Sequence, residues 1–274
     1  MDDDLGSFRR LVGEPDAAGD LARAALAVAR IEYPDLDPAS ELARLDALAA
    51  RSGARDVRRP AERLERLRRF FFEEEGFHGN AADYYDPRNS CLNDVLDRRL
   101  GIPITLSVLV MDVGRRVGLA IAGLGLPGHF IVRAEIDGRG VLLDPFHGGT
   151  LLSAVTAAEV SARAVGRPVT LEEAHWTPCT TRQILVRMLR NLKGIYARRD
   201  EWDKALAVVD RLLVVEPDSP VHLRDRGTVL VRAGRLHAGA AEWERYLERY
   251  PHARDAEGFR RELRRIRQDL GSRN

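Results

Sequence analysis

The stretch Leu119-Ala-Ile-Ala-Gly-Leu-Gly-Leu-Pro-Gly-His-Phe-Ile-Val-Arg-Ala-Glu-Ile-Asp-Gly-Arg-Gly-Val-Leu-Leu-Asp-Pro-Phe146 decides the fold class of this 274-residue chain. Asp137-Gly138-Arg139-Gly140 is typical of a hairpin turn between two strands. Three apolar runs, each bounded by turn residues, are typical of strands: 119–126, 129–136 and 141–144. The stretch therefore predicts a small antiparallel sheet over residues 119–145.

The chain before this stretch has the periodicity of helices. Apolar residues recur every three to four positions from Ala17 to Ala50, with Pro34 and Pro38 interrupting them, so we expect two helices joined by a turn. Residues 102–117 are apolar almost all round a helix, which predicts a central, buried helix. Helices up to residue 118, followed by strands, indicate an α+β fold with a helix-rich core and a small antiparallel sheet.

The C-terminal part contains a repeat with the tetratricopeptide period of about 34 residues. The same offset relates six pairs of positions: Leu189 and Leu223, Tyr196 and Leu230, Arg198 and Arg232, Ala205 and Gly239, Leu213 and Leu247, and Pro217 and Pro251. We expect residues 186–253 to form two antiparallel helix pairs. Because repeat arrays usually need about three or more units, we also expect these pairs to lean on the first domain.

The predicted organisation has three parts. Residues 1–150 form the α+β domain, residues 151–185 connect it to the repeats, and residues 186–274 form the tetratricopeptide-like helical region. Asn89 or Ser90 is expected to cap a short helix that runs through Leu100.

Composition and charge argue against several function classes. The 43 Lys and Arg residues balance 42 Asp and Glu residues, so there is no global field to attract nucleic acid. The arginines of residues 51–72 are interleaved with glutamates and predict a solvated helix face. No apolar run approaches the ~18 residues of a membrane span, and we expect neither such a span nor a signal peptide. Two cysteines, Cys91 and Cys179, are typical of a reducing cytoplasm.

A candidate site lies on the predicted hairpin. Gly128-His129-Phe130 begins one strand and Leu143-Asp144-Pro145 ends the next. If Asp137-Gly138 is the two-residue loop, Asp144 lies opposite Ile131, and strand parity places His129 on the same face at a diagonal of ~7–8 Å. We therefore expect His129 and Asp144 to be spatial neighbours. A carboxylate there can orient an imidazole that acts as a base or an acid.

Several motifs together make the chain resemble the SirB family. They are Phe72-Glu-Glu-Glu-Gly-Phe77, Gly79-Asn80, Tyr85-Asp-Pro-Arg-Asn-Ser90, Val95-Leu-Asp-Arg-Arg99, Gly101-Ile-Pro-Ile-Thr-Leu-Ser107, Pro127-Gly-His-Phe130 and Asp144-Pro-Phe-His-Gly-Gly149. Arg187-Met-Leu-Arg-Asn-Leu-Lys193 and Arg224-Asp-Arg-Gly227 extend the resemblance through the C-terminal part. It implies a transglutaminase-like (papain-like) core with an ancestral Cys–His–Asp triad, tetratricopeptide-type helices after it, and, by name, a link to virulence-gene regulation.

The resemblance places His129 and Asp144 at the histidine and aspartate of that triad. The nucleophilic cysteine is expected at the start of the buried helix, where this chain has Pro103-Ile104-Thr105. The Thr105 hydroxyl is in roughly the right place, but a threonine without its own N-terminal amine is a poor nucleophile. We expect Thr105 to act as a helix N-cap.

Cys91 is the second candidate nucleophile. It follows Asn89-Ser90 at a predicted helix start, a setting that lowers the pKa of a thiol. It lies one helix before the position that the resemblance implies for the nucleophile. We expect it to be buried and without a catalytic role.

No cofactor or metal site is expected. The other histidines lack HxxxH or HExxH spacing: His78, His147, His175, His222, His237 and His252. Gly123-x-Gly125-x-x-Gly128 runs from strand to strand with Pro127 inside it, so it is no phosphate loop.

Two functions remain open. One is a non-catalytic binding or regulatory scaffold, a pseudoenzyme that has lost its thiol nucleophile, and the missing cysteine favours it. The other is an active amide-bond hydrolase or acyl transferase that uses Cys91 or Thr105 with His129 and Asp144.

The resemblance also implies a partner surface. In tetratricopeptide geometry the first helix of each repeat lines a concave groove, and arginines recur there at the repeat offset, as Arg190 and Arg224 and as Arg198 and Arg232. Four guanidinium groups can clamp the carboxylates of an acidic protein or peptide partner. The alternative is that the chain's own carboxylates, such as Asp225, already satisfy them. The sequence indicates neither the partner's identity nor an oligomeric state.

Overall fold

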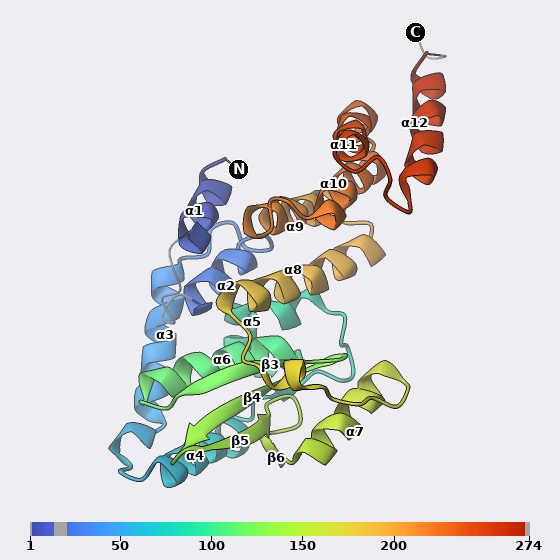
Figure 1. Ribbon diagram of the computed structural model, residues 1–274. Helices are drawn as coiled ribbons and strands as arrows, with labels where there is room; N and C mark the ends of the chain where they lie inside the picture. The colour runs from blue at the N-terminus through green and yellow to red at the C-terminus, as the bar shows by residue number, and fades with distance from the viewer. Residues whose placement is uncertain (1, 14–20, 272–274) are drawn as a thin grey trace. The chain divides into compact units, whose positions relative to one another are not determined.

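The computed structural model describes residues 2–13 and 21–271, and the chain forms two compact units (Figure 1). The first unit comprises residues 13–188, and the second comprises residues from Leu189 onward together with those up to Val12. No helix among the described residues is long and apolar enough to cross a membrane.

The first unit combines helices with an antiparallel sheet, which confirms the α+β fold. Its helices are α2 (Leu21–Ala29), α3 (Pro38–Arg51), α4 (Pro60–Arg69), α5 (Leu92–Arg98), α6 (Pro103–Arg116) and α7 (Ala154–Val165), with short helical turns at Ala54–Asp56, Phe70–Glu74, Pro87–Ser90 and Glu173–Trp176. The sheet has the order β3-β4-β5-β6, with β3 (Ile121–Leu126), β4 (His129–Ile136), β5 (Arg139–Asp144) and β6 (Thr150–Leu152). A two-residue parallel pair, β1 (His78–Gly79) with β2 (Leu100–Gly101), lies apart from it.

The β4–β5 hairpin has the predicted loop and register. Asp137 and Gly138 both have positive φ, 48° and 75°, as a two-residue type I′ loop requires. Val132 pairs with Leu143, and this register, continued by one residue, sets Asp144 opposite Ile131. The strand β6 was not predicted, because it is a three-residue edge strand whose Leu151 is exposed.

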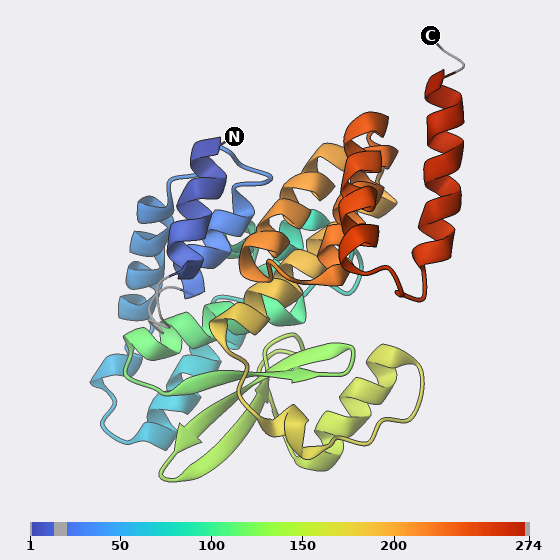
Figure 2. The ribbon, with the colours of Figure 1, turned by 45° about the horizontal axis from the view of Figure 1, so that its top comes forward.

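Helix α6 is the centre of the first unit, as the all-round apolar pattern predicted. Its residues from Pro103 to Val110 are buried without exception, and it packs against β3 and β4. Gly114 allows this close approach, because a Cβ there would lie 2.5 Å from Ile121. The helix covers one side of the sheet (Figure 2).

Residues 151–185, which we expected only to connect two domains, contribute to the first unit. They carry α7, whose Ala157 packs with Leu124, Leu126 and Ile131 on the sheet. The reason is that the sheet has a second apolar face, which needs its own cover.

The helices of the second unit fall where the sequence repeat predicts them. They are α8 (Thr181–Arg198), which begins in the first unit, α9 (Trp202–Val215), α10 (Pro220–Arg232), α11 (Leu236–Arg249) and α12 (Ala256–Gly271). Helices α9 and α11 begin one repeat period apart, at Trp202 and Leu236, and α8 and α10 end one period apart. Leu263 and Ile266 of α12 pack on Trp243 of α11.

The N-terminal helix α1 (Asp2–Gly13) packs with the repeats, although residues 1–150 were expected to form one domain. Phe8 is 1% exposed and lies under the Arg211 guanidinium of α9, 5.7 Å from the ring centroid. Asp4 forms an ion pair with the same guanidinium. Helix α1 therefore covers part of α9.

The small residue shared by the two repeats supports a prediction. A Cβ on Gly239 would lie 2.9 Å from the Gly227 carbonyl oxygen, closer than real contacts allow. We expect Gly239→Ala to lower the free energy of unfolding by about 1–3 kcal/mol. The matched control is Gly194→Ala, which meets nothing within 4 Å and should be neutral or stabilising by up to ~1 kcal/mol. Urea denaturation measures both, and equal stability of the two variants would contradict the close helix contact.

Candidate functional site

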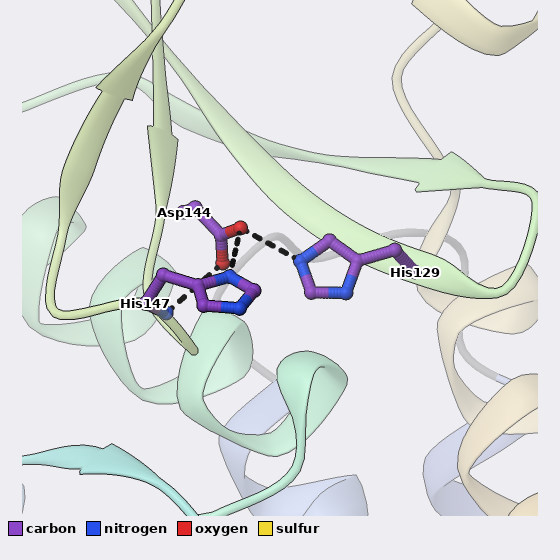
Figure 3. Close-up of side chains that lie close together, drawn as sticks. All are labelled: His129, Asp144 and His147. Atoms are coloured by element: carbon purple, nitrogen blue, oxygen red, sulfur yellow. Dashed lines mark hydrogen bonds and ion pairs between the residues drawn. The ribbon is translucent and has the colours of Figure 1, made fainter. Parts of the chain in front are cut away.

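The two ends of the β4–β5 hairpin bring His129 and Asp144 together (Figure 3). Gly128, with φ of 68°, closes the tight turn that starts β4 at His129. His129 Nε2 lies 2.8 Å from Asp144 Oδ2, and both side chains are buried. The predicted contact between them is therefore confirmed.

Asp144 is the hub of the site. It is wholly buried, and its Oδ1 accepts the backbone N–H groups of Phe146 at 3.0 Å and His147 at 3.3 Å. Its Oδ2 faces His129 and also His147 Nδ1, at 2.7 Å. Burial alone would raise the pKa of Asp144, but the hydrogen bonds and charges of the two histidines outweigh it and hold that pKa below its usual value. The group is thus a carboxylate at neutral pH, and each imidazole donates to it.

His147 was missed by the sequence analysis, which looked for metal spacing between histidines alone. It lies three residues after Asp144 in a turn closed by the Gly149 N–H, which donates to the Asp144 carbonyl at 2.9 Å. A side chain on Gly149, whose φ is 68°, would overlap the ring of Phe72. The signal was the Asp-x-x-His-Gly-Gly run, because the glycines permit the turn that returns His147 to the carboxylate.

Arg187 is a second residue that the sequence analysis did not assign to the site. Its Nη2 donates to the carbonyl oxygens of Leu126, at 2.9 Å, and of His129, and its guanidinium lies 5.4 Å from the Phe130 ring centroid. Burial lowers the pKa of Arg187. The side chain ties together the two strands that meet at His129, so it positions the histidine through the backbone.

Comparison with known proteins identifies the family. Residues 39–190 match the model of the transglutaminase-like superfamily, and residues 192–264 match a tetratricopeptide repeat model. A UPF0162 protein of Xylella fastidiosa (strain Temecula1) is 38% identical over 94% of this chain and 94% of its own length. The chain belongs to the SirB family.

Other SirB family relatives are more distant. Protein SirB1 of Salmonella typhimurium is 26% identical over 86% of this chain and 88% of its own length. A UPF0162 protein of Vibrio cholerae is 29% identical over 76% of this chain and 77% of its own length. No solved structure matches the chain.

In this SirB family protein, Thr105 does not cap helix α6. The N-cap is Ile102, whose side chain makes no capping hydrogen bond, and Thr105 is the third residue of the helix. Pro103 starts the helix, because its fixed φ suits the first position and it has no N–H to satisfy. Thr105 is fully buried, and its Oγ1 has no hydrogen-bond partner among the described residues.

Cys91 is buried, as expected, at the start of helix α5. Its Sγ donates to the Pro87 carbonyl at 3.6 Å. The predicted cap at Asn89 or Ser90 is wrong, because Cys91 is itself the N-cap and those residues belong to the preceding helical turn, which Asp86 caps.

The His129 side chain has one hydrogen bond and two ring contacts among the residues that the structure describes. It bonds to Asp144, and its ring lies 6.0 Å from that of Phe146 and 5.6 Å from that of His147, centroid to centroid. The structure thus brings together His129 and Asp144, the residues that the resemblance places in a triad, and adds His147. The Thr105 hydroxyl has no hydrogen-bond partner among the described residues, and the Cys91 thiol donates to the Pro87 carbonyl.

The four repeat arginines differ in their surroundings. Arg224 forms ion pairs with Asp225 at 2.9 Å and Asp255 at 2.8 Å, so the chain's own carboxylates satisfy it, as the alternative supposed. Arg190 lies 3.4 Å from Glu216, with both side chains at least one-third exposed. Arg198 and Arg232 are exposed. Their role as partner ligands stays a prediction.

Proposed function

We propose that this SirB family protein is a non-catalytic binding or regulatory scaffold that holds a protein or peptide partner through its tetratricopeptide repeats. The observation that carries the proposal is that His129 is hydrogen-bonded to Asp144, while the Thr105 hydroxyl has no hydrogen-bond partner among the described residues and the Cys91 thiol donates to the Pro87 carbonyl. Acyl transfer of the cysteine-protease type needs a nucleophile about 2.6–3.2 Å from its base.

The burial of both candidate nucleophiles further supports the scaffold. Cys91 and Thr105 are 0% exposed, so a substrate carbonyl has no open path to either. The Cys91 thiol also donates to the Pro87 carbonyl, so its hydrogen bond points to the backbone of its own turn.

The repeats supply the binding half of the proposal. Arg198 and Arg232 hold equivalent, exposed positions at the ends of α8 and α10. Arginine forks bind carboxylates in bidentate fashion, so an acidic segment of a partner is the chemistry that fits.

Charge reversal tests the binding surface. We expect the Arg190→Glu/Arg198→Glu double variant to reduce retention of a partner in pull-downs from the native cell by tenfold or more, about 1.4 kcal/mol. The fold should persist, because Arg190 and Arg198 are both exposed, and interactions of exposed charged side chains contribute about 0–1 kcal/mol. Arg261→Glu, at an exposed arginine of α12, is the matched control. If partner retention is unchanged and the free energy of unfolding is lowered, the arginines stabilise the fold and do not bind the partner.

The intact His129–Asp144 pair favours one alternative, an active amide-bond hydrolase or acyl transferase. Its test compares turnover of glutamine-containing peptides by the wild type, Cys91→Ala and Thr105→Ala. We expect all three to match the buffer rate. Turnover by the wild type that is lost in either variant would overturn the scaffold.

A further inference from the structure

Three ligand-type side chains converge at the end of the hairpin, and the proposed partner surface on the repeats does not use them. His129, Asp144 and His147 each offer one ligand atom, and these atoms all lie within 4.8 Å of one another (Figure 3). We infer that the three residues form a binding site for a divalent transition-metal ion, with Zn²⁺ as the ion that best fits the donors.

The geometry is close to that of a metal site. Asp144 Oδ2 lies 2.8 Å from His129 Nε2 and 2.7 Å from His147 Nδ1. Zinc lies about 2.0–2.2 Å from nitrogen and oxygen ligands, which separates two tetrahedral ligands by about 3.4 Å. Each nitrogen must therefore move from the oxygen by roughly half an ångström on binding, and the two nitrogens, which lie within 4.8 Å of each other, must come to about the same 3.4 Å separation. Rotation of the His147 ring, which is 49% exposed, supplies part of that movement.

The donor set selects the class of ion. Two imidazoles and one carboxylate suit zinc and other first-row transition metals, whereas Mg²⁺ and Ca²⁺ prefer oxygen ligands throughout. The site also has the outer hydrogen bonds that hold a ligand in place, because the N–H groups of Phe146 and His147 fix Asp144 Oδ1 and leave Oδ2 for the ion.

The three side chains differ in their exposure to solvent. His129 and Asp144 are buried, while His147 is half-exposed and marks the entry path. Three protein ligands leave the fourth tetrahedral position to water or to a ligand from solution.

Metal binding and the hydrogen-bonded cluster exclude each other. His129 Nε2 and His147 Nδ1 carry the protons donated to Asp144, so each must lose its proton, to solvent or to the other ring nitrogen, before it can bind the ion. A bound ion also replaces the His–Asp hydrogen bond on which a triad depends. Because a bound ion would prevent triad-type catalysis, the metal site agrees with a non-catalytic role. The inference of a metal site does not depend on the proposed scaffold function.

Cobalt titration of the chelator-treated full chain tests the inference, because Co²⁺ takes zinc ligands and absorbs visibly when bound. We expect one equivalent to bind and Zn²⁺ to displace it. His147→Ala should weaken binding on the order of 100-fold or more, since loss of even an outer hydrogen bond costs 10–100-fold. His237→Ala, at an exposed histidine of α11, is the matched control and should bind as the wild type does.

Two results would overturn the site: no saturable binding of one equivalent to the wild type, or equal affinity of the wild type and His147→Ala. If His147→Ala loses its fold by circular dichroism, His147→Gln replaces it with the same expected loss of binding. No partner protein is present in the titration, so its outcome is separate from the failure or success of the proposed scaffold.

Discussion

Replacing Asp144 with alanine is expected to lower the free energy of unfolding by about 3–5 kcal/mol, because it removes a buried carboxylate that accepts four hydrogen bonds, and hydrogen bonds to a charged group contribute about 1.5–3 kcal/mol each. The carboxylate is 0% exposed and accepts two backbone N–H groups in addition to two imidazoles. Its removal leaves the buried His129 without its partner and frees the turn that carries His147. Urea denaturation at pH 7 measures the loss.

Asp144→Asn is the conservative control. An amide oxygen can still accept the N–H groups of Phe146 and His147, so we expect a smaller loss than for alanine. An alanine variant within ~0.5 kcal/mol of the wild type, the range of ordinary surface substitutions, would contradict a structural role for the carboxylate.

The effect of Asp144 depends on pH in a direction that its pKa determines. Because the folded state lowers this pKa, the stabilisation is fully present above the unfolded value of about 3.9 and is lost as the pH falls through the folded value. The difference in stability between the wild type and Asp144→Ala should therefore shrink below about pH 4. If this difference in the free energy of unfolding grew as the pH fell, it would contradict a lowered pKa of Asp144 in the folded state.

A fragment of residues 182–274 is expected to show no cooperative thermal transition like that of the full chain. Two repeats are marginal alone. The fragment also lacks α1, whose Phe8 is 1% exposed under Arg211. Loss of a buried phenylalanine side chain by itself costs about 3–5 kcal/mol, a large part of the stability of a small domain.

The control for this fragment returns the missing helix. Fusion of residues 2–13 to the fragment through a flexible Gly/Ser linker should restore part of the thermal transition. Differential scanning calorimetry compares the fragment, the fusion and the full chain. A bare fragment that unfolds cooperatively at the full-chain temperature would refute the dependence of the repeats on other parts of the protein.

Local patterns predicted much of the fold. The Asp137-Gly138 loop determines the register of its hairpin, so the contact between His129 and Asp144 followed from residues only 15 apart. The all-round apolar pattern identified α6, and the repeat offset located the helices of the C-terminal part. In each case the signal and the structure lie within one supersecondary unit.

Features that depend on contacts distant in sequence could not be predicted. Helix α1 packs through Phe8 on Arg211 of α9, which lies far along the chain, and no local pattern indicates that pairing.

Two local features were also not predicted. The strand β6 has three residues, too few for an alternating pattern. Thr105 looked like a cap because hydroxyl side chains are favoured at helix N-caps, but the helix starts at Pro103 and its N-cap, Ile102, lies three residues before Thr105.

The hydrogen bonds of Asp144 bear on how the lineage of this chain can be interpreted. A carboxylate that closes its own turn and accepts hydrogen bonds from two imidazoles is needed for folding, with or without a thiol beside it. Substitution of this pair is therefore costly to the fold even in a protein that has no nucleophile. A relative that has a histidine and an aspartate at these positions therefore shares the fold of this site. Only a thiol beside the pair would indicate that the relative is a catalyst.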